Sequence, residues 1–362
     1  MKTIKHLYIH IPFCAKVCPY CAFHVHRGGG DYQREFVDAL VEEVGQIKEE
    51  YDLQLETIYF GGGTPSLLSP GLFEKICHSL PACLGEKTIE VNPKTVSLTK
   101  ARCWKEVGLN RISLGAQSFN QGYLKILGRD HTPKDIVCSV EILKEVGFDN
   151  LGIDLMFALP NQPREIWLST LKQALECQPT HLSCYGLTYE EDTPFFKSLA
   201  EGVWKKNEED EIWMFSETEE VLAEAGLPFY EISNFARNGF ESNHNQAYWL
   251  GKDYLGVGPS AYSTVGHARW QNLRDTREYI SGIRSGTSTK TEVERLSPEI
   301  KRKERWMFGL RMRNGIAMDE LQEFSTVIDK MILEGLLNLE SQRVRLSSKG
   351  RLVADCIAEY FA

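Results

Sequence analysis

Residues 8–23 read YIHIPFCAKVCPYCAF and contain three cysteines, Cys14, Cys18 and Cys21, separated by three and then two residues. The residues just before them, 7–11, predict a strand, which places the cysteines in the loop that follows it. Cysteine thiolates hold iron–sulfur clusters, and four of them would close a 4Fe–4S cube. Three cysteines leave one iron without a protein ligand. The spacing therefore predicts a cluster at which an outside molecule can coordinate.

A zinc site is the alternative interpretation of the same loop, with His24 or His26 completing a tetrahedron. The other seven cysteines are scattered along the chain, which is typical of buried structural thiols in a reducing compartment. The N-terminal residues show no hydrophobic stretch followed by a small-residue cleavage site, so no signal peptide is expected. These observations favour a cytoplasmic location.

Composition limits the class of protein. The chain has 362 residues, of which 42% are hydrophobic and 25% charged, and these fractions exclude a disordered or fibrous protein. The net charge of −9 argues against a chain that coats nucleic acid, and no nucleic-acid partner is expected. The longest apolar run, residues 151–160, is interrupted by Asp154 and is too short to span a bilayer.

Short β-rich runs alternate with helical patterns through the first two-thirds of the chain. Apolar residues three and four positions apart, as in Phe36, Leu40, Val44 and Ile47, predict the helices. Six units of strand then helix imply parallel strands covered by helices, in a barrel or in an open sheet. The strands are predicted at residues 7–11, 56–60, 88–91, 111–114, 151–157 and 181–185.

Three regions are expected along the chain. Residues 1–229 form the barrel or sheet, residues 230–290 are an irregular Gly- and Tyr-rich region, and residues 291–362 are a small C-terminal domain. The C-terminal pattern is helix, helix, hairpin and closing helix, which resembles a winged helix. These elements are predicted at residues 299–313, 318–335, 336–346 and from 349 onward.

Several polar or glycine residues fall in loops after the predicted strands, where a barrel places its ligand sites. The sequence GGGTP at residues 61–65 follows the second strand, and its glycines allow close approach to the backbone. Asp154 is a carboxylate within an apolar strand, which is costly unless it has a partner. The guanidinium of Arg129 is suited to clamping a carboxylate.

The three-cysteine loop and its flanking residues resemble the cluster loop of radical S-adenosylmethionine (SAM) proteins. The resemblance is to the branch of oxygen-independent coproporphyrinogen III oxidases and HemW heme chaperones, and it covers nearly the whole chain. It implies an α/β fold, an incomplete parallel (β/α)6 barrel with a small winged-helix-like α+β domain. It also implies a 4Fe–4S cluster held by Cys14, Cys18 and Cys21, whose open iron binds SAM and whose electron cleaves it to a 5′-deoxyadenosyl radical. The positions that match SAM contacts in the family are Tyr8, Gly62, Gly63, Thr64, Glu90, Gln117, Arg129 and Asp154.

Residues 242–249 read SNHNQAYW and resemble the HNxxY heme signature of the HemW branch. The resemblance implies that His244 contacts heme, with Tyr248 as its pocket partner, and neutral imidazole is a common heme ligand. Related oxidases carry a further cysteine where this chain has Phe23, and they have a longer N-terminal segment. Two family positions also differ, where this chain has Ala22 instead of Asp and Tyr262 instead of His.

The resemblance therefore favours a heme chaperone that delivers heme to apo-hemoproteins, either respiratory enzymes or a bacterioferritin-like store. The alternative is a coproporphyrinogen III oxidase that removes propionate carboxyl groups in heme biosynthesis. The sequence leaves open whether the chain is an enzyme, and it also leaves open a peripheral contact with a membrane.

Overall fold

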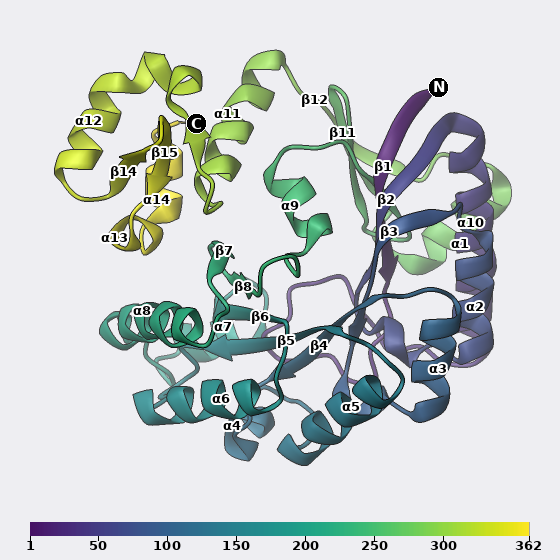
Figure 1. The fold of residues 1–362 in the computed structure, drawn as a ribbon. Coiled ribbons are helices and arrows are strands. Elements are labelled where there is room, and N and C mark those ends of the chain that lie inside the picture. The colour runs from purple at the N-terminus through teal and green to yellow at the C-terminus, as the bar shows by residue number, and fades with distance from the viewer. Residues whose placement is uncertain (362) are drawn as a thin grey trace.

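Six parallel strands form the centre of the protein, and they follow one another in chain order. The computed structural model describes residues 1–361 and is drawn in Figure 1. Each strand pairs in parallel with the next, which confirms the six predicted strands and the α/β class. The strands are longer than predicted: β1 (Lys2–Ile11), β2 (Tyr51–Gly62), β3 (Cys83–Val91), β4 (Arg111–Gln117), β5 (Asn150–Phe157) and β6 (His181–Gly186).

Additional strands extend both edges of this sheet. Strand β9 (Leu255–Val257) lies parallel to β1, while β8 (Asn234–Ala236) is antiparallel to β6 and pairs with β7 (Phe229–Glu231). The sheet is therefore an open curve of nine strands that runs from β7 to β9.

Residues 230–290 differ from the expectation of an irregular region. Besides β8 and β9 they contain two helices and a hairpin, and β12 continues the hairpin into a three-stranded antiparallel sheet. Strands of three to five residues carry too little periodicity to be distinguished from loops in the sequence. The further elements are α9 (Asn243–Trp249), β10 (Tyr262–Val265), β11 (Ala268–Asn272), α10 (Thr276–Ser285) and β12 (Lys290–Arg295).

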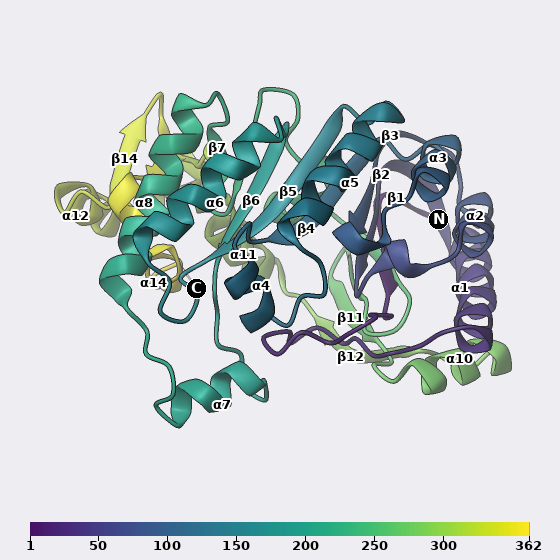
Figure 2. The same ribbon diagram turned by 90° about the horizontal axis from the view of Figure 1, so that it is seen from below.

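Amphipathic helices cover the outer side of the curved sheet, as Figures 1 and 2 show. In α1 the predicted apolar face (Phe36, Leu40, Val44 and Ile47) is buried. Short polar loops begin several of these helices, as where Thr132 and Asp135 form a reciprocal capping box at α5. These helices are α1 (Asp31–Glu50), α2 (Pro70–Ser79), α3 (Leu98–Glu106), α4 (Gln121–Ile126), α5 (Pro133–Glu145), α6 (Arg164–Glu176) and α8 (Glu208–Glu224), with 3-10 turns η1 (Pro65–Leu67) and η2 (Pro93–Thr95). The short helix α7 (Pro194–Ala200) lies apart from the sheet (Figure 2) and contacts the cysteine loop through Phe195.

The C-terminal domain has its own apolar core, which includes Trp306, Ile328, Leu337 and Val344. Its helices and two-stranded wing agree with the expected α+β arrangement, but the helix predicted at 318–335 is divided by a non-helical residue, Leu321. The elements are α11 (Pro298–Leu310), β13 (Ile316–Ala317), η3 (Met318–Phe324), α12 (Ser325–Leu333), β14 (Leu337–Glu340), β15 (Arg343–Leu346), α13 (Ser348–Arg351) and α14 (Ala354–Glu359). Ala362, the last residue of the expected domain, lies outside the described residues. Within residues 1–361, the structure contains no helix with the length and apolarity of a bilayer span.

Candidate functional site

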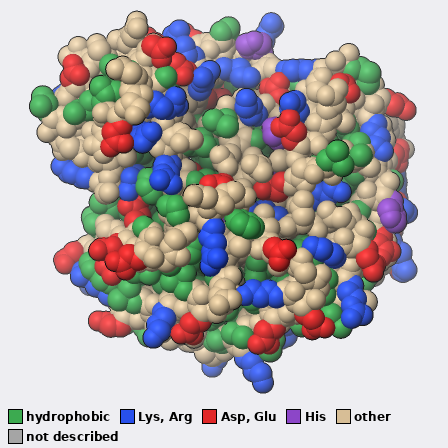
Figure 3. Space-filling view, in the orientation of Figure 1, with side chains coloured by type: hydrophobic (Ala, Val, Ile, Leu, Met, Phe, Trp, Pro, Cys, Tyr) green, Lys and Arg blue, Asp and Glu red, His purple; other side chains and the backbone are tan. Residues whose placement is uncertain are grey.

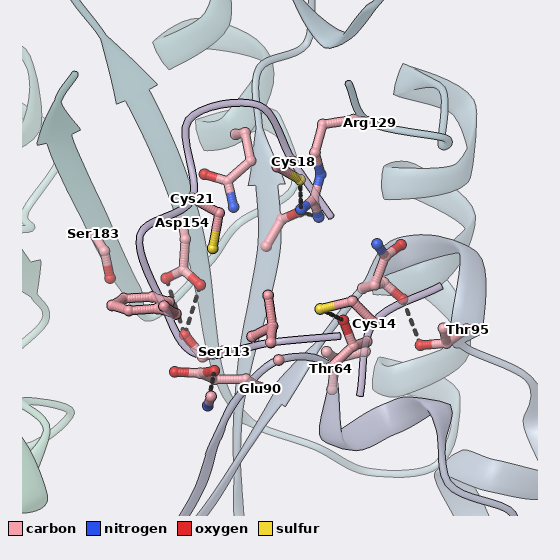
Figure 4. A pocket seen from close by; sticks show the side chains of 18 of the residues that line it. Cys14, Cys18, Cys21, Thr64, Glu90, Thr95, Ser113, Arg129, Asp154 and Ser183 are labelled. Atoms are coloured by element: carbon pink, nitrogen blue, oxygen red, sulfur yellow. Dashed lines mark hydrogen bonds between the residues drawn. The ribbon is translucent and has the colours of Figure 1, made fainter. Parts of the chain in front are cut away.

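The three cysteines lie on one loop between β1 and α1, and all three line a single cavity inside the barrel. Backbone hydrogen bonds close the base of this loop: Cys14 donates to the carbonyl of His26 at 3.0 Å, and His26 donates to the carbonyl of Pro12 at 2.9 Å. The buried ring of Phe13 packs edge-on against Phe36 of α1. The loop is therefore anchored at both ends, and its cysteines face inward (Figure 4).

The glycine motif at the end of β2 is hydrogen-bonded to the start of the cluster loop. The backbone nitrogens of Gly63 and Thr64 donate to the carbonyls of Ile11 and Phe13, each at 2.8 Å. The Thr64 hydroxyl donates to Sγ of Cys14 at 3.6 Å. A Cβ atom on Gly63 would lie 2.7 Å from the carbonyl oxygen of Phe13, and Gly62 has a φ of 105°. Only glycine permits this close approach of the two loops.

The donor set fits a cluster better than a single metal ion. Burial raises the pKa of the Cys14 thiol to about 11 and also raises that of Cys21, so a bound metal must displace their protons. Among residues 1–361, no three side chains of His, Cys, Asp or Glu converge as they would around one ion. The ring nitrogens of His26 contact Thr276 and its own chain instead. These contacts occupy His26, whereas Nε2 of His24, the other histidine of the zinc alternative, is buried and has no hydrogen-bond partner within the described residues. A cubane would bind each cysteine through a different iron.

The cavity beside the cysteines has a volume of about 530 Å³ and two buried carboxylates in its wall. Glu90 accepts hydrogen bonds from the Tyr59 hydroxyl at 2.9 Å and from the backbone nitrogen of Gly62 at 3.1 Å. Burial raises the pKa of Glu90 to about 7, although the bond from Tyr59 opposes this shift. Glu90 thus holds the glycine motif in place while it faces the cavity.

Asp154 lies on β5, in the middle of the predicted apolar run. Both its carboxylate oxygens accept from the Ser113 hydroxyl, at 2.9 and 2.8 Å (Figure 4). Burial raises the pKa of Asp154, and hydrogen bonds from Ser113 and Ser183 oppose the increase. The cost of placing a carboxylate here is therefore reduced by hydroxyl donors on both neighbouring strands.

Arg129 approaches the cysteines from the opposite wall. Its Nη2 donates to the carbonyl of Gly115 at 2.8 Å, and its Nη1 lies 3.7 Å from Sγ of Cys18. The Nε atom is buried and has no hydrogen-bond partner within the described part of the chain. Gln117, with a φ of 67°, lines the same wall. An unpartnered guanidinium N–H beside the cluster loop is suited to donate a hydrogen bond to the carboxylate of SAM, the expected ligand.

Seven of the predicted cofactor residues line this cavity together with the cysteines, and three do not. Those in the wall are Gly62, Gly63, Thr64, Glu90, Gln117, Arg129 and Asp154. Tyr8 is not among the lining residues; it stacks on Tyr59 at 6.1 Å between ring centres and contacts Nδ1 of His10 through its hydroxyl. His244 and Tyr248 also lie outside this cavity.

His244 is buried at the start of α9, with an exposed fraction of 1%. Its Nδ1 lies 2.7 Å from the Thr57 hydroxyl, its Nε2 lies 2.8 Å from the Tyr248 hydroxyl, and its ring stacks on Tyr59. Burial lowers the pKa of His244 to about 3, so the imidazole is neutral near pH 7. Glu86 of β3 fixes this turn, because its carboxylate accepts from the backbone nitrogens of residues 243 and 244 at 3.0 and 3.1 Å.

Sequence reasoning missed several residues, most of them polar, that share the cavity wall with the predicted ones. They stand at alternate positions of β3–β6, so that they face the barrel interior between apolar residues that face the helices. That alternation within apolar strands was the signal available in the sequence. The missed wall residues on these strands are Thr88, Arg111, Ser113, Gly115, Met156, His181, Ser183 and Tyr185.

Comparisons with known proteins agree with this geometry. Residues 8–174 match the radical SAM superfamily, and residues 296–353 match the HemN C-terminal domain. The chain is 33% identical to the heme chaperone HemW of Lactococcus lactis, over 98% of this chain and 96% of that protein. It is 36% identical to the heme chaperone HemW of Escherichia coli, over 75% of this chain and 73% of that protein. Coproporphyrinogen III oxidase of Escherichia coli has the same fold, with a TM-score of 0.84 at 22% identity, over 99% of this chain and 90% of that one.

Proposed function

Because this chain belongs to the HemW family of the radical SAM superfamily, we propose that it is a heme chaperone. In this proposal it holds a 4Fe–4S cluster and SAM in the barrel cavity, binds heme, and delivers it to apo-hemoproteins such as respiratory enzymes or a heme-storage protein. One observation carries the proposal: three cysteines on one anchored loop face a cavity whose opposite wall presents Arg129. The relative from Lactococcus lactis, which aligns over 98% of this chain, is named as a heme chaperone.

Cys14, Cys18 and Cys21 are the proposed ligands of the cluster. When bound, such a cluster supplies an electron and an open iron at which a cofactor can coordinate. Arg129 is positioned to orient a carboxylate through its unpartnered Nε. The carboxylate of Asp154 is placed to accept hydrogen bonds from hydroxyl groups, and its negative charge favours a cationic ligand.

The neighbouring wall residues would hold the rest of SAM. The turn at Gly62 and Gly63 presents backbone groups at the cavity surface, which suits an amino group, and Glu90 fixes this turn. Thr64 and Gln117 also line the cavity. These residues bind and orient the cofactor in the proposal, while Tyr8 supports them through Tyr59.

His244 and Tyr248 are the proposed heme contacts. Neutral imidazole is the form that ligates iron, and the low pKa of His244 keeps it in that form. In the described conformation Nε2 of His244 is bonded to the Tyr248 hydroxyl, so direct ligation requires that this hydroxyl move aside. Heme binding should then change the environment of Tyr248.

The test is anaerobic reconstitution followed by titration with hemin. We expect about four irons per chain in the reconstituted protein. We also expect saturable binding of SAM, and saturable hemin binding with a shifted Soret band. Transfer is tested by mixing the hemin-loaded protein with an apo-hemoprotein and following its holo spectrum. Absence of saturable hemin binding would overturn the chaperone assignment.

The oxidase alternative makes a different prediction in the same preparation. With SAM, a reductant and coproporphyrinogen III, an oxidase would release carbon dioxide and form the divinyl product. The likeness to the Escherichia coli oxidase is one of fold and does not extend to its substrate. Turnover of coproporphyrinogen, with no hemin transfer, would favour the oxidase over the chaperone.

A further inference from the structure

A second cavity, of about 730 Å³, lies between the core and the C-terminal domain. Its walls come from the end of α9, from β10 and β11, and from α11. Its volume falls within the range of roughly 300–1,000 Å³ that small-molecule sites occupy. None of its lining residues belongs to the wall of the cluster cavity. We call it the α9–α11 cleft.

Helix α9 separates the two cavities. Ser242 and Asn245 line the cluster cavity, whereas Tyr248 and Trp249, at the other end of the same short helix, line the α9–α11 cleft. His244 lies between them, buried, and reaches the cleft through its hydrogen bond to Tyr248. The spacing of this motif therefore places its aromatic residues in the cleft and its histidine next to them, bonded to Tyr248.

Aromatic side chains dominate the walls of the cleft. Trp249 of α9 packs edge-on against Phe308 of α11, with ring centres 5.9 Å apart, and this contact joins the two domains. Tyr248 packs edge-on against Tyr254 at 4.6 Å. Such walls suit a flat conjugated ligand, which can stack on one ring and meet the edge of another. The full aromatic set is Tyr248, Trp249, Tyr254, Tyr262, Trp306 and Phe308.

The cleft is basic in a chain whose net charge is −9. Five cationic side chains line it against two carboxylates, and Lys and Arg side chains gather over α11 in Figure 3. Arg269 is fully occupied by a two-point ion pair with Glu304, at 2.7 and 2.9 Å. Lys301 donates to the carbonyl of Gly266 at 2.6 Å. These two cations are therefore committed to the protein itself.

The fifth cation, Arg305, is paired with Glu320 at 2.9 Å, so two cations remain available to a ligand. The Arg302 side chain is 56% exposed, and its nearest carboxylate, Glu323, lies 3.6 Å away in an equally exposed pair that is worth little. Lys252, just after α9, is exposed and forms no ion pair within residues 1–361. One cation thus comes from each side of the cleft.

We propose that the α9–α11 cleft seats the tetrapyrrole of heme, with its ring against the aromatic walls and its propionate carboxylates toward Lys252 and Arg302. This inference rests on the proposed heme-chaperone function and assigns the place of binding. Arg302, the available cation of the run at residues 301–305, then recognises the ligand's charge together with Lys252, and the C-terminal domain forms half of the site. Heme and SAM occupy separate cavities on the two sides of α9.

The experiment compares hemin with hemin dimethyl ester, which keeps the ring but lacks both carboxylates. The protein is the reconstituted full chain, and the variants are Lys252→Glu and Arg302→Glu. A matched control is Lys330→Glu on α12, which is 77% exposed and lies outside the cleft. We expect each cleft variant to weaken hemin binding at least tenfold, with ester binding, SAM affinity and iron content unchanged. Lys330→Glu should behave as the wild type.

The aromatic wall is tested by Trp249→Leu, which should weaken binding of hemin and of the ester alike. Saturable hemin binding that both charge reversals leave unchanged would overturn the placement in the cleft and leave the chaperone function standing. Equal binding of hemin and its ester by the wild type would likewise overturn the carboxylate contacts. If the wild type bound no hemin, the proposed function and this inference would both fail.

Discussion

The hydroxyl oxygen of Tyr248 lies 2.8 Å from Nε2 of His244, one turn earlier on α9. The other ring nitrogen of His244 lies 2.7 Å from the hydroxyl of Thr57 on β2. Thr57 in turn contacts Nδ1 of His6 at 2.9 Å, so that four polar side chains form one buried chain. The motif that resembles a heme signature therefore also fastens α9 to the barrel.

A double-mutant cycle measures the interaction energy between His244 and Tyr248. His244→Ala removes the partner of the Tyr248 hydroxyl, leaves the Thr57 hydroxyl bonded to His6 alone and opens a cavity, and we expect the free energy of unfolding to fall by about 2–4 kcal/mol. Tyr248→Phe removes one hydroxyl and should cost about 0.5–1.5 kcal/mol. Because His244 and Tyr248 are hydrogen-bonded to each other, the loss of unfolding free energy in the double variant should be smaller, by about 1 kcal/mol, than the sum of the losses in the two single variants. Chemical denaturation measures all three, and strict additivity would contradict the coupling.

Loss of any one cluster cysteine should abolish the cluster. Cys14→Ala, Cys18→Ala and Cys21→Ala should each fall from about four irons per chain to well below one, since no further cysteine among residues 1–361 lines the cavity. Cys356→Ala, at an exposed position on α14, is the control and should keep the full iron content. Iron and sulfide analysis after anaerobic reconstitution provides the measurement. A single tightly bound zinc in the wild type would contradict the assignment.

Two glycine-to-alanine substitutions should have opposite effects. In Gly63→Ala the added methyl group would lie 2.7 Å from the carbonyl oxygen of Phe13, so the cluster loop must shift. We expect a loss of about 1–3 kcal/mol in unfolding free energy and a lower iron content. Gly45 is an exposed residue inside α1 with nothing within 4 Å of its added methyl group, and Gly45→Ala should stabilise by about 0.5–1 kcal/mol. Thermal or chemical unfolding distinguishes the two, and destabilisation by both would contradict the argument.

Much of the barrel was predictable because its signals are local. Strands β1–β6 are apolar runs separated by helical patterns, and the three cysteines and the glycine motif each lie within a few residues. Family resemblance added the distant members of the site, such as Arg129, which no local pattern links to Cys18. Seven of these positions do face the cavity together with the cysteines.

The features that could not be predicted depend on contacts between segments that lie far apart in the sequence. Glu86 on β3 binds the backbone at residues 243 and 244, more than 150 positions away, and nothing in its own neighbourhood marks it. The basic run at residues 301–305 reads as a solvated helix face until α11 is seen against α9. Family resemblance predicts Tyr8 among the cofactor contacts; in the structure its ring stacks on the wall residue Tyr59.

The role of Arg129 is tested by a charge-conserving change. Arg129→Lys keeps the positive charge but loses the planar two-point geometry, and we expect roughly tenfold weaker SAM binding. Arg129→Ala should weaken it roughly a hundredfold. Arg102→Lys, at an exposed position on α3, is the control. Isothermal titration of the reconstituted protein gives the affinities, and iron analysis checks that the contact with Cys18 is not needed for the cluster. Equal SAM affinity in all variants would contradict the clamp.

Acid should destabilise the protein partly through His131, which is buried with its Nε2 bonded to the carbonyl of Ala116 at 3.0 Å. Burial, aided by the positive charge of Arg129, lowers the pKa of His131 from 6.5 to about 4. Above pH 6.5 the ring is neutral in both states and its titration contributes nothing. Below pH 6.5 only the unfolded chain takes up the proton, so stability falls as the pH decreases toward 4.

The slope due to one such histidine is about 1.4 kcal/mol per pH unit. Buried Glu90 and Glu231, whose pKa values are raised to about 7, act in the opposite direction, because their burial costs less once they are protonated. The pH dependence of the wild type's unfolding free energy therefore combines the contributions of several groups. A comparison with His131→Gln separates the contribution of His131, since glutamine can still donate to the carbonyl of Ala116. At pH 7.5 the variant should be less stable than the wild type. Between pH 6.5 and 5 the stability difference should narrow by about 2 kcal/mol, because only the wild type loses the histidine contribution. Denaturant titrations at each pH measure this, and two parallel curves would show that His131 is protonated equally in the folded and unfolded states.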